Sequence, residues 1–297
     1  MKKVIIWGLL NKRHSHRYIH KGFYQSFKMM GYEVNWVDDS VKNQKFLNGK
    51  NLVIAVNVAS EYLVNNPENF YVTHNIEKIT FKDAENVLRL QVKTVDSEGK
   101  PLDDSVALYD SKTRSLFQPW GIPESEKLWL SANDNPGKTE YWVGSIWNNS
   151  LNQGNLEAIS EFKCALEDVG VKLKRIGGTR WVTKDGISSE KAFSYVNKSP
   201  LGTAVVGQWQ KEKGYLPCRI FKNVAAGMVA SSNSDMSSIF GDTGVFSERI
   251  TELVANVYSL SSKEKYDRSK SAQEKIKLYT YQAGISRILR VIHQNLD

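Results

Sequence analysis

Short apolar runs and one amphipathic segment alternate through the first 123 residues. The run 4–9 is rich in residues that favour strands, and a polar, histidine-rich turn follows it. Over 18–30 the apolar side chains recur at helical spacing, and a second strand pattern occupies 33–37. The order strand, helix, strand predicts a βαβ unit on a parallel sheet. Further strands are expected at 51–58, 70–73, 87–92 and 105–109, before a Pro/Gly turn within 115–123.

The same pattern restarts after a polar, turn-rich segment at 124–139. Residues 140–146 predict a strand, and 156–169 predict an amphipathic helix closed by Gly170. Beyond it we expect strands at 171–176, 202–207 and 228–231, and helices at 189–196, 217–226, 247–260 and 263–296. The second half is therefore a second βαβ series.

Two such series predict an α/β protein with two Rossmann-like domains. We place the first domain at 1–125, a linker at 126–139, the second domain at 140–275 and a final helix at 276–297. The length of 297 residues, about twice that of a common domain, agrees with this division.

Composition narrows the class of protein. Hydrophobic residues make up 41% of the chain and charged residues 24%, which are values of a globular protein. There is no apolar span near 18 residues and no leader cleavage site after the first apolar run, so we expect a cytoplasmic protein without a transmembrane segment, for which peripheral membrane contact stays open. Cys164 and Cys218 match no metal-ligand spacing and are expected to be buried thiols.

The first strand-to-helix turn holds an unusual cluster of basic residues. Its sequence, LNKRHSHRYIH, contains His14, His16 and His20 together with Arg17. An open parallel sheet places its ligands at such turns, outside the carboxyl ends of its strands. The cluster could supply a general base near neutral pH, bind an anion or ligate a metal, and a solvated basic turn is the alternative.

Three turns in the second half follow strands and can present backbone N–H groups to a phosphate. They contain Gly144-Ser145, Gly178 with Arg180, and Ser234. Each of these signals is weak when taken alone.

The helix expected at 217–226 is more specific. Pro217 stands at its start and Gly227 at its end, as helix termini favour. Arg219 and Lys222 lie three residues apart and would meet a diphosphate on one helical face, whereas an exposed basic face is the alternative.

The layout of the whole chain resembles the GT-B glycosyltransferase superfamily. The strongest motif is Arg219-Ile220-Phe221 through Ala225-Ala226-Gly227, which is similar to a helix of the form R-hydrophobic-F-x-x-x-A-x-G before a short strand. Tyr141 to Ser145 resembles the opening strand and glycine loop of the superfamily's second domain, and Leu173 to Gly178 resembles its second strand and glycine turn.

This resemblance implies two facing Rossmann-like domains with a sugar nucleotide in the cleft and a C-terminal helix that crosses back to the first domain. It implies that Arg219 holds the donor diphosphate, with Gly144 and Ser145 approaching from the other side. The turn from Gly178 to Arg180 would lie near the nucleotide, and we assign Lys222 and Ser234 to the same donor site.

One departure from the superfamily leaves the stereochemistry open. Many retaining members carry two glutamates eight residues apart around this helix, where Gly214 and Lys222 stand here. A lysine cannot accept hydrogen bonds from ribose hydroxyls as a carboxylate does. In inverting members a base in the first-domain turns often takes the acceptor's proton; His16 is our first candidate for it and His14 the second, because the helix dipole at the expected helix start would keep His16 neutral.

The remaining candidates are strand-end residues on the acceptor side, together with Arg17. Asp38-Asp39 is the nearest approach to the Asp-x-Asp of metal-dependent transferases, and a strand-end cap or an acceptor contact is the favoured interpretation. For His74 a core or capping role is an equal alternative. Since no metal-binding constellation is visible, no metal and no cofactor are expected.

We therefore expect a metal-independent glycosyltransferase that moves a sugar from a nucleotide sugar, such as a UDP- or GDP-sugar, to a glycan or other hydroxyl acceptor. A noncatalytic nucleotide- or glycan-binding protein of the same fold is one alternative. A nucleic-acid-binding or nucleic-acid-modifying protein is another, suggested by the net charge of +8 and by 8 Trp and 13 Tyr. Most of these aromatic residues fall in core patterns, so no stable nucleic-acid partner is expected.

Overall fold

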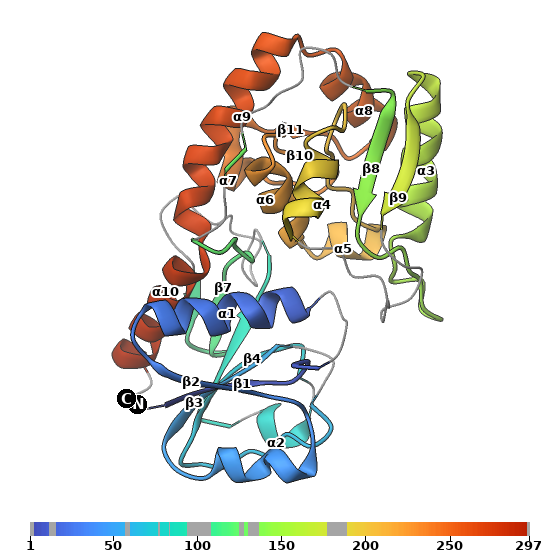
Figure 1. The fold of residues 1–297 in the computed structure, drawn as a ribbon. Coiled ribbons are helices and arrows are strands. Elements are labelled where there is room, and N and C mark those ends of the chain that lie inside the picture. The colour runs from blue at the N-terminus through green and yellow to red at the C-terminus, as the bar shows by residue number, and fades with distance from the viewer. Residues whose placement is uncertain are drawn as a thin grey trace. The chain divides into compact units, whose positions relative to one another are not determined.

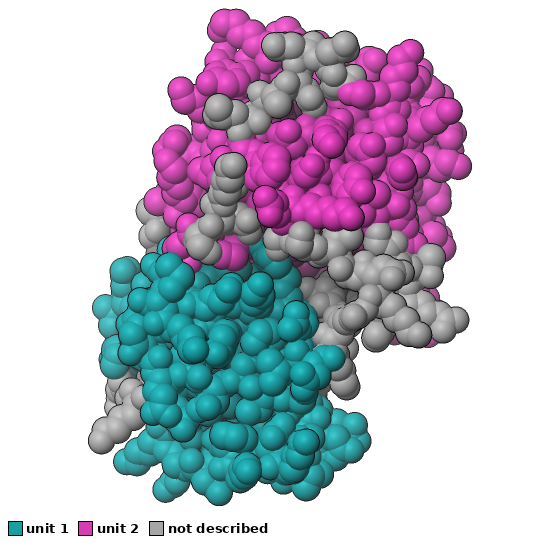
Figure 2. All heavy atoms as spheres, viewed as in Figure 1, with its two compact units in different colours: residues 1–91, 107–118, 280–297 teal, residues 92–106, 119–279 magenta. Residues whose placement is uncertain are grey.

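The computed structural model describes residues 3–11, 16–56, 60–76, 78–82, 84–93, 108–124, 128–129, 137–176 and 189–295. The chain forms two compact units, which Figure 2 distinguishes by colour. Unit 1 comprises residues 1–91, 107–118 and 280–297, and unit 2 comprises residues 92–106 and 119–279.

The boundaries between the two units do not coincide with the predicted linker at 126–139, which lies inside unit 2. Leu128 and Trp129 pack against the core of unit 2, and the Trp129 N–H donates to the Ala225 carbonyl at 2.7 Å. The turn-rich composition of this segment therefore does not mark a boundary between the two units.

Unit 1 is built on a seven-stranded sheet in the order β2-β1-β3-β4-β5-β7-β6. The predicted opening βαβ unit is present, because β1 pairs with β2 in parallel from Lys3↔Glu33 to Trp7↔Val37. All neighbouring strands are parallel except β6, which is antiparallel to β7. The strands are β1 (Lys3–Trp7), β2 (Glu33–Val37), β3 (Asn51–Val56), β4 (Phe70–His74), β5 (Val87–Gln91), β6 (Leu108–Asp110) and β7 (Ser115–Phe117).

Helices cover both faces of this sheet. Figure 1 shows α1 (Arg17–Met29) and α10 (Tyr281–Asn295) along one face, and α2 (Ile79–Lys82), with the 3-10 helix η1 (Val41–Leu47), along the other. Gly22 lets α10 approach α1, because a Cβ there would collide with the ring of Tyr281. The ring of Phe23 meets the same tyrosine edge to face, with ring centroids 5.3 Å apart.

The single helix expected at 263–296 is interrupted. The structure has α9 (Ser262–Ile276), the 3-10 helix η3 (Lys277–Tyr279) and then α10. The break falls where the chain passes from unit 2 to unit 1, and there the Tyr279 carbonyl accepts a hydrogen bond from the Ile122 N–H at 3.2 Å. The last helix does return to the first unit, as expected.

Unit 2 repeats the βα layout on smaller sheets. β8 (Thr139–Val143) pairs in parallel with β9 (Lys172–Ile176), and β10 (Ser231–Ser232) pairs in parallel with β11 (Val245–Phe246). The predicted strand 202–207 is reduced to one parallel bridge between Ala204 and Ser232. The helices are α3 (Leu156–Asp168), α4 (Ser189–Val196), α5 (Gln208–Glu212), α6 (Cys218–Ala225), α7 (Ser237–Phe240), α8 (Ile250–Tyr258) and α9, with the 3-10 helix η2 (Gly241–Thr243).

Two apolar clusters hold unit 2 together. One joins α3 and α8 around Trp142 and Phe162, and the other joins α6 and α9 around Phe221. The prediction of buried cysteines is wrong: Cys164 is exposed and Cys218 is partly exposed. Cys164 falls on the outward face of α3, whose buried positions are 159, 162, 165 and 166. Within the described chain no helix has the length and apolarity needed to cross a bilayer.

Candidate functional site

The turn that follows β8 is fixed by one buried asparagine. The Asn155 side chain donates from Nδ2 to the Ser145 carbonyl at 3.2 Å and accepts from the Trp147 N–H at Oδ1 at 3.0 Å. Gly207 lies so close to Gly154 that a Cβ would collide with its carbonyl oxygen. The turn 144–155 is therefore held against the segment that follows the 203–206 stretch, at the carboxyl ends of the strands.

Arg219 reaches this edge of unit 2 from the first turn of α6. Its guanidinium lies over the ring of Trp142, with Cζ 3.6 Å from the ring centroid. Nε donates to the Val143 carbonyl at 3.2 Å, and Nη1 donates to the Val205 carbonyl at 3.5 Å. The side chain thus bridges the carboxyl ends of two neighbouring chain segments.

The lack of a side chain at Gly144 makes room for this arginine. Its φ of +147° is a conformation that residues with a side chain rarely adopt, and a Cβ there would collide with Nη2 of Arg219. The predicted proximity of Gly144 and Arg219 is therefore present in the structure, and both backbone and space require a glycine at this position.

The charge of Arg219 is partly buried and has no acidic partner in the part of the chain that the structure describes. Burial lowers the pKa of Arg219 to about 10, so the group remains a cation at neutral pH. A partly desolvated cation that lacks a counter-charge destabilises the fold. Perturbed groups of this kind concentrate at functional sites, and this one is suited to binding an anion.

The other donor-side candidates differ in accessibility. Lys222 lies one turn further along α6 and is partly buried. Ser234 is fully buried, and its hydroxyl donates to the Tyr215 carbonyl at 2.9 Å, which ties the segment after β10 to the one before α6. Gly178 and Arg180 lie outside the described residues.

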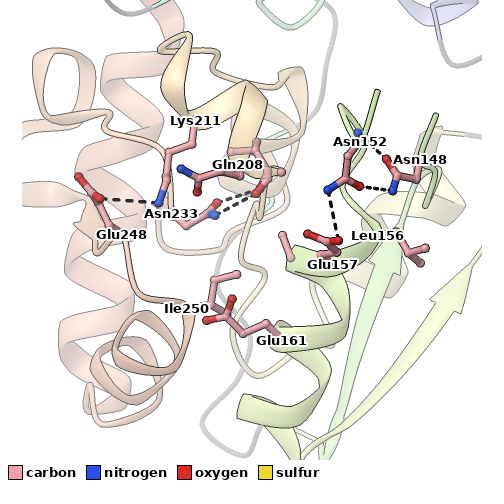
Figure 3. Close-up of a pocket in the computed structure, with 14 residues that line it drawn as sticks. Asn148, Asn152, Leu156, Glu157, Glu161, Gln208, Lys211, Asn233, Glu248 and Ile250 are labelled. Atoms are coloured by element: carbon pink, nitrogen blue, oxygen red, sulfur yellow. Dashed lines mark hydrogen bonds and ion pairs between the residues drawn. The ribbon is translucent and has the colours of Figure 1, made fainter. Parts of the chain in front are cut away.

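A polar cavity of about 320 Å³ lies beside the same strand ends, between the start of α3, α5 and the residues that follow β10 and β11 (Figure 3). Three carboxylates line it, those of Glu157, Glu161 and Glu248, against the single amine of Lys211, whose Nζ lies 3.6 Å from Glu248. Its amide side chains are Asn148, Asn152, Gln208 and Asn233. The excess of negative charge disfavours a diphosphate here, so we place anion binding at Arg219 and not in this cavity.

In unit 1 the predicted histidine cluster is only partly described. His14 lies outside the described residues, while His16 is the N-cap residue of α1 and is partly buried. Arg17 is exposed; its Nε donates to the Leu10 carbonyl at 3.0 Å, and its guanidinium lies over the ring of Trp36. His20 is buried, with its ring nitrogens 2.9 Å from the His16 carbonyl and 3.0 Å from the Trp7 carbonyl, and burial lowers its pKa. His20 therefore packs the turn, as its place one turn into the helix predicts.

The strand-end acids and His74 have structural partners. Asp38 accepts from the backbone N–H of Asn11 at 3.0 Å and from its side-chain amide at 2.5 Å. Asp39 accepts from Trp7 Nε1 at 2.7 Å and from the Tyr62 N–H at 3.1 Å. His74 is buried and donates from Nδ1 to the Leu90 carbonyl, and burial lowers its pKa to about 4. His74 is therefore neutral at pH 7 and holds β4 to β5.

Trp142 is a site residue that the sequence analysis did not predict. It stands in a predicted strand, and nothing in the strand pattern indicates that its ring meets a side chain 77 positions later. Among the described residues no group of three or more His, Cys, Asp or Glu side chains could hold a metal ion.

Comparisons with known proteins give a similarity in structure only. No protein-family model matches the sequence, and no curated protein sequence matches it. An alpha-glucosyltransferase in complex with UDP is similar at a TM-score of 0.62 and 11% identity, over 98% of this chain and 99% of that one.

An alpha-glucosyltransferase in complex with UDP and a 13-mer DNA has a TM-score of 0.62 at 10% identity, over 98% of this chain and 99% of that one. A structure described as "Trehalose-6-phosphate from E. coli bound with UDP-2-fluoro glucose" has a TM-score of 0.60 at 8% identity, also over 98% and 99%. At these identities the similarity establishes the fold, and it confirms the prediction of two Rossmann-like domains of the GT-B type.

Proposed function

We propose that this protein is a glycosyltransferase that takes its sugar from a nucleotide-diphosphate sugar, with a UDP-sugar as the first candidate. The observation that carries the proposal is the partly buried guanidinium of Arg219, which has no acidic partner among the described residues and lies at the carboxyl ends of the unit 2 strands. Proteins of the same fold have been solved with UDP and with UDP-2-fluoro glucose, which supports the choice of donor.

The chemistry of such a transfer suits this arrangement. When the bond between the sugar and the diphosphate breaks, negative charge increases on the leaving phosphate oxygens. Arg219 would stabilise that charge, helped by the N-terminal dipole of α6 and by backbone N–H groups of the turn after β8. We propose that these groups do the work of a divalent cation, so that transfer needs no metal.

The acceptor remains to be found by experiment. We propose a glycan or another hydroxyl acceptor, deprotonated by His16 of unit 1. DNA is a second candidate acceptor, because an alpha-glucosyltransferase of the same fold was solved with UDP and DNA and because this chain carries a net charge of +8.

Binding of UDP to the full chain tests the donor half of the proposal. We expect UDP to raise the melting temperature in a concentration-dependent way, since a ligand that binds only the native state stabilises it by RT ln(1 + [L]/Kd). Uridine, which lacks the diphosphate, is the matched control and should stabilise far less. Equal stabilisation by both would contradict a diphosphate site at Arg219.

Turnover separates the enzyme from a binding protein of the same fold. A panel of UDP- and GDP-sugars is incubated with the protein and released nucleoside diphosphate is measured, first with water alone, then with oligosaccharides, then with duplex DNA. Release that depends on oligosaccharide supports a glycan acceptor, and release that depends on DNA supports the second candidate. Tight UDP binding without release under any of these conditions would favour the noncatalytic alternative.

A further inference from the structure

The indole ring of Trp142 lies between an apolar core and a charge. On one side it belongs to the cluster of α3 and α8, with its ring centroid 6.4 Å from that of Phe162. Its ring face also carries the Arg219 guanidinium, with Cζ at 3.6 Å from the centroid. A distance this short is a close cation–π contact, and Trp provides the strongest platform for it among the aromatic side chains.

The polar atom of this ring is unsatisfied. Trp142 is 2% exposed, and its Nε1–H finds no hydrogen-bond partner among the described residues. A buried donor without a partner destabilises the folded state. A phenylalanine would fill much of the same volume and has no N–H to leave unpaired.

The described contacts of Arg219 leave its Nη2 without a protein acceptor. Nε and Nη1 donate to the carbonyls of Val143 and Val205, while no described residue accepts from Nη2, which lies against Gly144. The contact to Val205, at 3.5 Å, is a weak one, so the two hydrogen bonds alone hold the plane of the group loosely. A flat ring beneath it fixes the plane, because stacking restricts rotation about the side-chain torsions.

We propose that Trp142 is a positioning residue for the donor: its ring face holds the Arg219 guanidinium flat across the end of β8, so that Nη2 presents its N–H donors to a phosphate. This inference rests on the proposed function and names the residue that orients its anion-binding group. Trp142 does not itself touch the ligand; its effect passes through Arg219.

The test is Trp142→Phe, assayed by calorimetric titration of the full-length protein with UDP and with uridine. We expect the Kd for UDP to increase about three- to tenfold, in line with the loss of the stronger cation–π partner, while the Kd for uridine stays unchanged. The melting temperature should change little, because removing an unpaired buried donor offsets the packing lost with the smaller ring. A purely structural role predicts no selective loss of UDP affinity.

Two further variants make the comparison specific. Trp120→Phe is the matched control, because Trp120 is also buried in unit 2, at 3% exposure, and the change should leave UDP affinity unaltered. In an Arg219→Ala background, Trp142→Phe should have no additional effect on UDP binding, since the group that it positions is gone. Trp142→Tyr retains an aromatic face and should give an intermediate Kd; it also replaces the phenylalanine variant if that one does not fold.

The outcomes separate this inference from the proposed function. Wild-type protein that binds neither UDP nor GDP refutes both. Wild-type binding that Arg219→Ala weakens, but that Trp142→Phe and Trp142→Tyr leave unchanged, refutes the positioning role alone. A parallel loss of UDP and uridine affinity in Trp142→Phe also refutes it, because the ring would then shape the site as a whole and would not act through the charge.

Discussion

Replacing Arg219 by alanine should remove donor binding while leaving the fold about as stable as the wild type. Burial lowers the pKa of Arg219 to about 10, and at 1.36 kcal/mol per pH unit this depression corresponds to a cost on the order of 3 kcal/mol for holding the charge. The same substitution loses the stack on Trp142, worth about 1 kcal/mol, and a charge-assisted hydrogen bond to Val143, worth about 2 kcal/mol. The stability gained by removing the charge and the stability lost with these two contacts therefore nearly cancel.

The loss of UDP affinity in Arg219→Ala is not compensated by any gain of this kind. Losing a charged contact to the diphosphate should cost about 2 to 4 kcal/mol, which raises the Kd for UDP about 30- to 1,000-fold and lowers kcat/KM by a similar factor. Calorimetric titration gives the Kd, and thermal unfolding of the same sample gives the stability.

Two companion variants sharpen the result. Arg219→Lys keeps the charge without the planar fork and should recover part of the affinity. Gly144→Ala perturbs the same contact from the other side, because its Cβ would take the space of Nη2, and should weaken UDP binding comparably. If Arg219→Ala binds UDP within twofold of wild type, or loses binding only through unfolding, the reasoning is wrong.

Three further predictions concern other parts of the molecule. Burial raises the pKa of Glu140 to about 7, although its carboxylate accepts the N–H groups of Leu201 and Gly202. Because this folded-state pKa lies above the unfolded value of 4.5, the stability due to Glu140 is fully present below pH 4.5 and is lost as the pH rises through 7. The loss should be on the order of 3 kcal/mol. Urea unfolding from pH 4 to 8 should show this decrease in the free energy of unfolding, and Glu140→Gln should abolish it. His16→Ala should reduce transfer roughly 100-fold with UDP affinity unchanged, and a parallel loss of affinity would instead place His16 at the donor. Transfer should persist in EDTA, and activity that only manganese or magnesium restores would contradict the metal-independent mechanism.

Much of the fold follows from local sequence patterns. Strand-type runs of four to eight residues between turn residues located β1 to β5, and helical spacing located α1 and α3, to within a few residues. Errors arose where long-range packing decides the outcome. The segment around Leu128 and Trp129 has a linker's composition but packs on the unit 2 core, and the helix predicted at 263–296 breaks because the chain changes units there.

For the candidate site, the sequence could predict which residues lie at strand ends but not which of them have partners in the fold. Gly144 and Arg219 stand in turns and helix starts where an open sheet binds ligands, and the structure brings them into contact. The same rule also selected Ser234 and His74, which are buried and hydrogen-bonded to backbone carbonyls. Position along the chain does not reveal whether a polar group has a partner, since that partner comes from distant sequence.

Whether a polar group has a hydrogen-bond or charge partner within the fold therefore distinguishes candidates that look alike in sequence. Asp39 accepts two hydrogen bonds and Ser234 donates to a carbonyl, so the fold already satisfies both. Arg219 is different, because the described chain gives its partly buried charge carbonyl contacts and a ring face but no acidic partner. An unpaired charge of this kind lowers the stability of the folded protein. A bound anion would pair with it, so the free energy of UDP binding includes the recovery of that lost stability. This coupling is the reason to expect UDP to stabilise the protein much more strongly than uridine does.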